Sequence, residues 1–322
     1  MEDENTTVTE EVLSGDPIKF ILLLTIEILS FPCTLLILSF LLFNWRSMII
    51  KGLRNHFILS LVLVTFIYLT MDLPFTIQYY ELGYDMHHSI LFCLWWYWLD
   101  YTLVVICIFL TAAASIQRHV LIFHAHWLHQ HRRRWLLHFV PILACVFYPG
   151  VFYLVVMSIH PCVYDESIYC SAPCYTDNII LFNLDWILNT AFPLLTIILA
   201  NITLIVRVIR SMKKTRRRQS LTWKRQRKLT LQLIALSSLF VLGWAPSTVV
   251  SIVQSFALPT LFSDIPQLAY LNYLTYFVCP LQPFLCLFGL PELLKSLTTS
   301  FKFLRRRSRV NPVNTMQPVV MT

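Results

Sequence analysis

Seven runs of about 20 apolar residues constrain this chain more than any other feature of its sequence. They fall at residues 18–43, 56–80, 90–123, 135–159, 178–209, 229–257 and 266–290. A helix of about 20 residues crosses the hydrocarbon core of a bilayer. Only 13% of the chain is charged, whereas soluble domains are about a quarter charged. The sequence therefore predicts an all-α membrane protein, a bundle of seven transmembrane helices.

The basic residues predict how this bundle is oriented. Of the 25 lysines and arginines, 24 lie in the alternate segments 46–54, 118–134, 207–228 and 295–309, and Lys19 stands apart. Positive residues are retained on the cytoplasmic side. We therefore expect a multi-pass membrane protein with its N-terminus outside and its C-terminus inside. The net charge of +8 then belongs to a face that meets anionic lipid or an acidic partner, and it requires no nucleic acid.

These runs divide the chain into four expected parts. Residues 1–17 form an extracellular tail, 18–290 the bundle, 291–304 a short amphipathic cytoplasmic helix and 305–322 a cytoplasmic tail. The amphipathic helix is predicted because apolar residues recur there at helical spacing before three arginines, a pattern typical of a helix lying on the inner leaflet.

The sequence predicts covalent modification at two positions. Asn5 begins an Asn-Thr-Thr glycosylation sequon in the outer tail. Ser220 follows a run of arginines and fits a site for a basophilic kinase, where phosphate would reduce the local positive charge. Four of the nine cysteines are expected on the oxidising side and predict two disulfides among three possible pairings: Cys93, Cys162, Cys170 and Cys174.

The third apolar run carries a charged residue toward each end. Arg118 follows Cys93 by 25 residues, a rise of about 37 Å, so the two span the membrane. Asp100 precedes Arg118 by 18 residues, about five turns, which places both on one face of the helix. One side of this helix therefore offers a carboxyl group outward and a guanidinium inward.

These residues resemble the rhodopsin-like G-protein-coupled receptors over about residues 18–303. The third helix of that family has a cysteine at its top and, 25 residues on, the arginine of a D/E-R-Y motif. Here they are Cys93 and Gln117-Arg118-His119. The other matches, in order, are Leu73-Pro74, Phe192-Pro193, Phe240…Gly243-Trp244-Ala245-Pro246 and Gln282-Pro283-Phe284-Leu285-Cys286.

The chain departs from the family where the family places charges and tyrosines. Gln117 replaces the acid beside the arginine, and Gln226 stands where many relatives carry an acid at the foot of the sixth helix. Thr65 replaces the sodium-binding aspartate, while Asn201 and Cys286 replace two motif tyrosines. We therefore expect no sodium site of the family type, and raised basal signalling.

The resemblance implies a receptor that binds an extracellular ligand and activates a heterotrimeric G protein as the sixth helix moves outward. Arrestin and receptor kinases are implied as further partners, and no cofactor is implied. Arg118, with Gln117 and His119, is expected to form the floor of the G-protein site. The activation hinge is expected at Phe240, Trp244, Pro246 and Pro283.

Four acids lie in or near the outer halves of the helices: Glu27, Asp72, Asp100 and Asp185. Intramembrane carboxyl groups are functional candidates unless a neighbouring helix uses them as hydrogen-bond acceptors. Either the pocket is strongly electronegative or it holds protonated carboxyls. Asp100 stands where the family's amine receptors bind their ammonium ligand, and we expect a cationic ligand, an amine or a basic peptide. The expected contacts are Asp100, Asp185, Asp72, Tyr101 and Trp244.

Cys174 precedes Pro193 by 19 residues, which favours it as the partner of Cys93 and leaves Cys162 with Cys170. Cys170 is a rival partner for Cys93.

Other classes fit the sequence less well. A secondary transporter for a cationic solute is the main alternative, but the chain has only 6 glycines and lacks internal repeats. It shows no nucleophile–base or H-E-x-x-H arrangement, so we expect no enzyme. The histidines at 124, 126, 129 and 131 are not spaced as tetrahedral ligands on one helical face, and no metal is expected.

Overall fold

A computed structural model of the chain provides the fold. It describes residues 16–46, 55–83, 89–123, 130, 132, 135–160, 173–214, 220–256, 268–288 and 293. Asn5, Cys162, Cys170, the histidines at 124–131 and nearly all of the expected amphipathic helix lie outside these residues. The described residues are mostly helical and contain no strand, so the predicted all-α fold is confirmed.

The helical segments match the seven predicted spans. In chain order they are α2 (Pro17–Phe43), α3 (Asn55–Ile67), η2 (Tyr68–Asp72), α4 (Leu73–Leu82), α5 (Ile90–Phe123), η4 (Trp135–Phe139), α7 (Val140–Ile159), η5 (Cys174–Asp177), α8 (Ile179–Asp185), η6 (Trp186–Ala191), α9 (Phe192–Lys214), α10 (Ser220–Phe256), α11 (Leu268–Thr275) and α12 (Val278–Phe288). Six uninterrupted helices are long and apolar enough to cross a membrane. The seventh span is α11 and α12, joined by a turn at Tyr276 and Phe277.

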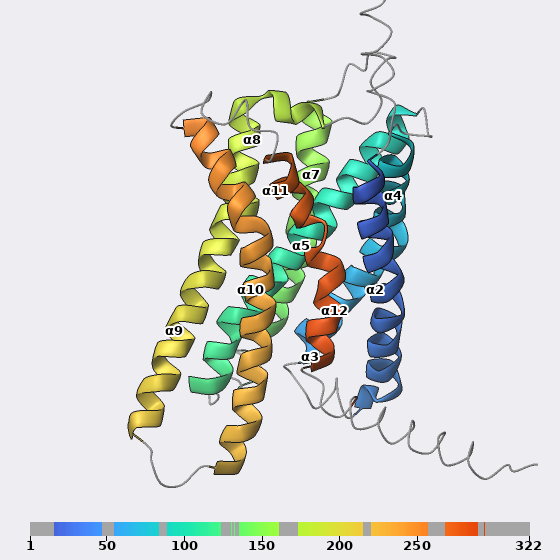
Figure 1. The fold of residues 1–322 in the computed structure, drawn as a ribbon. Coiled ribbons are helices and arrows are strands. Elements are labelled where there is room, and N and C mark those ends of the chain that lie inside the picture. Colours follow the sequence, from blue (N-terminus) through green and yellow to red (C-terminus); the bar gives the residue numbers. More distant parts are fainter. Residues whose placement is uncertain are drawn as a thin grey trace, which may run out of the picture.

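Helix α5 is the central element of the bundle. It packs against α3, α7, α9 and α10, and Figure 1 shows it running obliquely behind α10 and α12. In the most apolar 18-residue stretch of α5, 61% is buried inside the bundle. The corresponding share is 22% for α2 and for η4–α7. Residues carried by α5 therefore reach most of the other helices.

The outer helices present apolar side chains outward. Along α7 the exposed side chains include Leu143, Phe147, Val151 and Leu154, which recur at helical spacing. A stripe of this size would be costly in water, whereas in lipid it needs no cover. The exposed stripe agrees with a multi-pass membrane protein.

Three spans contain a wider, π-helical turn directly before an X-Pro step. Segment η2 precedes Leu73-Pro74, η4 precedes Val140-Pro141, and η6 precedes Phe192-Pro193. Because proline has no N–H, the carbonyl four residues before it loses its helical partner. In two of these turns the residue before the proline donates its N–H to the carbonyl five residues earlier: Leu73 N–H to Tyr68 O, and Phe192 N–H to Ile187 O. Each such turn rotates the side chains around it relative to the rest of the helix.

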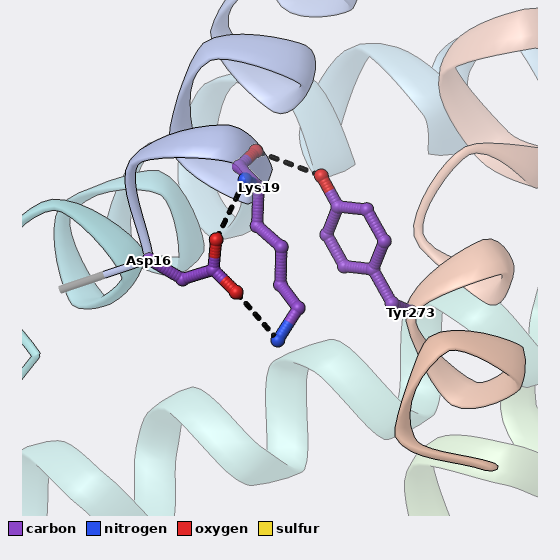
Figure 2. A network of polar contacts seen from close by, with 3 residues as sticks. All are labelled: Asp16, Lys19 and Tyr273. Atoms are coloured by element: carbon purple, nitrogen blue, oxygen red, sulfur yellow. Dashed lines mark hydrogen bonds and ion pairs between the residues drawn. The ribbon is translucent and has the colours of Figure 1, made fainter. Parts of the chain in front are cut away.

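Lys19 holds the outer end of α2 against the seventh span. Its ammonium lies 2.9 Å from Asp16 Oδ2, and its backbone carbonyl accepts a 2.7 Å hydrogen bond from Tyr273 (Figure 2). The same ammonium lies 5.4 to 5.8 Å from the ring centres of Tyr80, Tyr270 and Tyr273. Hydrogen bonding with Lys19 lowers the pKa of the Asp16 carboxyl. Lys19 is therefore engaged at the edge of the bundle.

Gly243 lets α10 approach α12 closely. A Cβ atom at this position would overlap a methyl group of Val278, so that side chain or one of the helices would have to move. Gly150, in α7, is different: an added Cβ there would lie 3.7 Å from Thr102 and 3.9 Å from Trp98, ordinary contact distances.

We expect Gly243→Ala to lower the thermal stability of the purified protein, since overpacking costs about 1–3 kcal/mol. Adding Val278→Ala should restore most of the loss, because it removes the overlapping methyl group. Gly150→Ala is the matched control and should leave the melting temperature unchanged or raised. Equal effects of the two alanine variants would contradict the close approach.

Candidate functional site

Asp72 and Asp100 lie together in the outer half of the bundle. Trp96 Nε1 donates to Asp72 Oδ1 at 2.8 Å, and the Asp100 carboxyl group lies close to that of Asp72. Asp72 is fully buried, and Oδ1 of the half-buried Asp100 is buried as well. The two side chains therefore form one acidic pair, from η2 and α5, inside the bundle.

Aromatic side chains surround this half of the bundle. The ring of Tyr101 lies 6.4 Å from Tyr97, 5.5 Å from Tyr153 and 6.3 Å from Tyr175, measured between centres. Trp244 of α10 lies 6.4 Å from Trp186 of η6. Tyr101 therefore sits at the junction of α5, α7 and η5, one residue after Asp100.

Asp185 joins three elements of the bundle. Its Oδ1 accepts hydrogen bonds from Tyr153 (2.8 Å) and Asn189 (2.7 Å), and its Oδ2 accepts one from Tyr175 (2.8 Å). The carboxyl group is buried. Asp185 is thus an acceptor for neighbouring elements, the structural role that the sequence left open for these acids, and its contact with a ligand stays a prediction.

Cys93 and Cys174 are both disulfide-bonded. Cys93 lies in the first turn of α5 and Cys174 begins η5, the segment that carries Tyr175. Cys162 and Cys170 lie outside the described residues, so the pairing of Cys93 with Cys174 stays a prediction.

Arg118 lines a cavity at the opposite end of the bundle. The walls come from α3, α5, α10 and α12, and the lining residues are Phe57, Ile58, Leu61, Ala114, Gln117, Arg118, Leu121, Gln232, Leu236 and Cys286. Arg118 is largely buried, with 8% of its surface exposed. The Arg118 side chain is therefore largely enclosed by these four helices.

The residues on either side of Arg118 bind other helices. The Gln117 amide hydrogen-bonds His138 Nδ1 of η4, and His119 Nε2 lies 2.7 Å from the carbonyl oxygen of Ala200 in α9. These two contacts attach the inner end of α5 on two sides.

Hydrogen bonds between neutral groups are found at Thr65 and Cys286, where the resemblance leads one to expect an aspartate and a tyrosine. Gln282 Nε2 donates to Thr65 Oγ1 at 3.1 Å, at the place of the family's sodium site. Gln232 Nε2 donates to the Cys286 carbonyl at 3.4 Å, and the hydroxyls of Ser115 and Ser237 are 3.4 Å apart. The two contacts of α10 are long for hydrogen bonds and therefore weak.

The expected hinge residues lie along α10 and α12. Phe240 is fully buried, Trp244 and Pro246 are half-buried within α10, and Pro283 is buried within α12. Ser220 is the first residue of α10, but its side chain lies outside what the structure describes. The described residues bring together no cluster of three metal-ligating side chains.

The sequence indicated the candidate aspartates but not the side chains that donate hydrogen bonds to them. Tyr153, Tyr175 and Trp96 hold Asp185 and Asp72, and only their aromatic character marked them. His138 offered a clearer signal, because it is a lone imidazole in the apolar run 135–159.

A family model described as "7 transmembrane receptor (rhodopsin family)" matches residues 35–285, more than half of the chain. No curated protein matches the chain.

We expect Asp185→Asn to lower the melting temperature of the purified protein, because the new amide cannot accept hydrogen bonds from all three donors. Buried donors left without a partner cost about 1–3 kcal/mol each. Tyr175→Phe, which removes one donor, should cost less. Asp177→Asn makes the same charge change at an exposed position and is the control. A melting temperature unchanged by Asp185→Asn would show that the three bonds do not hold these elements together.

Proposed function

Because the chain belongs to the rhodopsin family of seven-transmembrane receptors, we propose that it binds an extracellular cationic ligand and activates a heterotrimeric G protein. The position of Arg118 in the inner cavity carries this proposal. The same helix bears Asp100 in its outer half. One continuous element, α5, therefore runs from the proposed ligand site to the proposed partner site.

The Asp72–Asp100 pair supports a cationic ligand. No lysine or arginine contact to either carboxyl group is found among the described residues, and Lys19 is engaged by Asp16. An ammonium or guanidinium group would supply the missing counter-charge, and nearby aromatic faces suit cations. Both a basic peptide and a biogenic amine meet these requirements.

The weak inner contacts of α10 support an outward movement of this helix. Among the described side chains, α10 has two inner hydrogen bonds, through Gln232 and Ser237, and both are 3.4 Å long, whereas α5 is held at His119 by a 2.7 Å contact. Pro246 removes a backbone hydrogen bond and provides a hinge in α10. Outward movement of the inner half would widen the cavity beside Arg118.

Arg118 suits a helical partner. A planar guanidinium can hydrogen-bond and stack on the carbonyl groups at the C-terminal end of a helix, where the helix dipole is negative. The G protein would enter from the cytoplasmic side, with the receptor's N-terminus outside the plasma membrane. Arrestin and receptor kinases would bind the same face, and the chain would act as a receptor, without catalysis of its own.

We expect Arg118→Glu to abolish ligand-free G-protein activation, because the reversed charge repels the partner's carbonyl groups. The measurement compares cells with matched surface expression. Arg210→Glu is the control: it makes the same charge change at an exposed position on α9, and it should reduce activation less. Equal activation by wild type and Arg118→Glu would contradict the assigned role of Arg118.

We expect Asp100→Asn to weaken the potency of a cationic agonist about 10- to 100-fold, since hydrogen bonds to charged groups contribute about 1.5–3 kcal/mol. The agonist would come from a screen of biogenic amines and Arg- or Lys-containing peptides. Asp177→Asn, at the exposed outer rim, should change potency little. An agonist whose potency is indifferent to Asp100→Asn would exclude Asp100 as its counter-ion.

A further inference from the structure

Three polar side chains from three helices form one hydrogen-bonded chain at the inner end of the bundle. Gln117 of α5 bonds His138 Nδ1, and His138 Nε2 lies 2.6 Å from His56 Nδ1 of α3. A contact of this length between two ring nitrogens requires a hydrogen between them. We refer to Gln117, His138 and His56 as the histidine chain.

Two members of the histidine chain, Gln117 and His138, are shielded from water, whereas His56 is half-buried. His138 is fully buried and Gln117 is 5% exposed. The rings of Phe57 and Phe139 pack against His138, with ring centres 5.6 Å and 4.8 Å away. A buried imidazole that lost one of these partners would find no water in its place, and an unpaired buried polar group is costly. The three side chains therefore depend on one another.

This chain fixes the rotation of α5 at Arg118. Consecutive helical residues point about 100° apart, so anchoring Gln117 toward η4 and α3 also fixes the direction of the next side chain. His119, the residue after Arg118, contacts Ala200 of α9. With both neighbours anchored, Arg118 is presented to the cavity that α10 closes.

We propose that His138 and His56 are positioning residues for Arg118: through Gln117 they hold the guanidinium toward the cavity before a partner arrives. The Gln117 amide nitrogen is committed to His138, and Gln117 and Arg118 line the same inner cavity. This inference rests on the proposed function, because it assigns a role at the same inner site.

A double-mutant cycle on the purified receptor tests the chain itself. Gln117→Met and His138→Phe each remove one link while keeping the side-chain volume similar. Each should lower the melting temperature, and the double variant should lose little more than the worse single variant, because both changes break one chain. Fully additive losses would show that the chain does not act as a unit.

The positioning role needs a second readout, receptor-stimulated nucleotide exchange on purified heterotrimers of each Gα class. Each single variant should slow exchange about fivefold, the equivalent of one buried hydrogen bond, and the double variant should again be no slower. His56→Gln keeps a hydrogen-bonding group beside His138 and should retain exchange, whereas His56→Phe should not. His160→Phe, at the opposite end of α7, is the control.

The outcomes separate the two ideas. If Arg118→Glu abolishes exchange but the chain variants lower only the melting temperature, the chain is structural and the positioning role is wrong. If Arg118→Glu has no effect, or if the wild type stimulates no heterotrimer, the proposed function fails and the inference fails with it. Slowed exchange in the chain variants, with rescue by His56→Gln, supports the proposal.

Discussion

The fold depends on one constraint: in lipid, backbone N–H and C=O groups must find partners within their own span or in a neighbouring one. Continuous helices meet it, and the described part of this chain is helical almost throughout. Prolines interrupt the pattern: π-helical turns precede Leu73-Pro74, Val140-Pro141 and Phe192-Pro193, whereas Pro32, Pro149, Pro246 and Pro283 lie inside α-helices without one. Two of these turns adjoin candidate residues: Asp72 ends η2 and Asp185 directly precedes η6.

The inner end relies on neutral hydrogen bonds where the family uses charges. Thr65 and Gln282 bond each other at the place of the sodium site, and Gln117 bonds His138. Hydrogen bonds between neutral groups each contribute about 1 kcal/mol, less than those to charged groups. Among the inner hydrogen bonds given for the described residues, those of α10 at Gln232 and Ser237 are the longest, at 3.4 Å. We infer that α5 is the fixed element of this end and α10 the movable one.

The sequence predicted the seven spans well because each is defined by local apolar composition. The ends of α5 and α7 fall at residues 123 and 159, as predicted, whereas α10 begins at Ser220, ahead of the predicted residue 229. That extension is polar and basic, so no apolar run marks it. Gly243 was identified only by its motif, although a glycine is needed there because the backbone packs closely against Val278.

Contacts between helices were much less predictable than the helices themselves. His56 and His138 are 82 residues apart, and neither residue indicates the other in the sequence. Asp72 and Asp100 were both identified as candidates, but the sequence did not indicate that Asp72 ends a π-helical turn, η2. The acceptor role of Asp185 likewise needed Tyr153 and Tyr175 from two other elements.

The most direct test of the account is the distance between the inner ends of α10 and the fourth span, measured by pulsed electron paramagnetic resonance on the purified receptor in nanodiscs. Spin labels at Leu231 of α10 and Leu136 of η4 would use side chains that are 55% and 57% exposed. The account predicts a longer-distance population that becomes dominant when a nucleotide-free G protein is added. A distance distribution unchanged by every heterotrimer would contradict the outward movement of α10, and with it the proposed signalling mechanism.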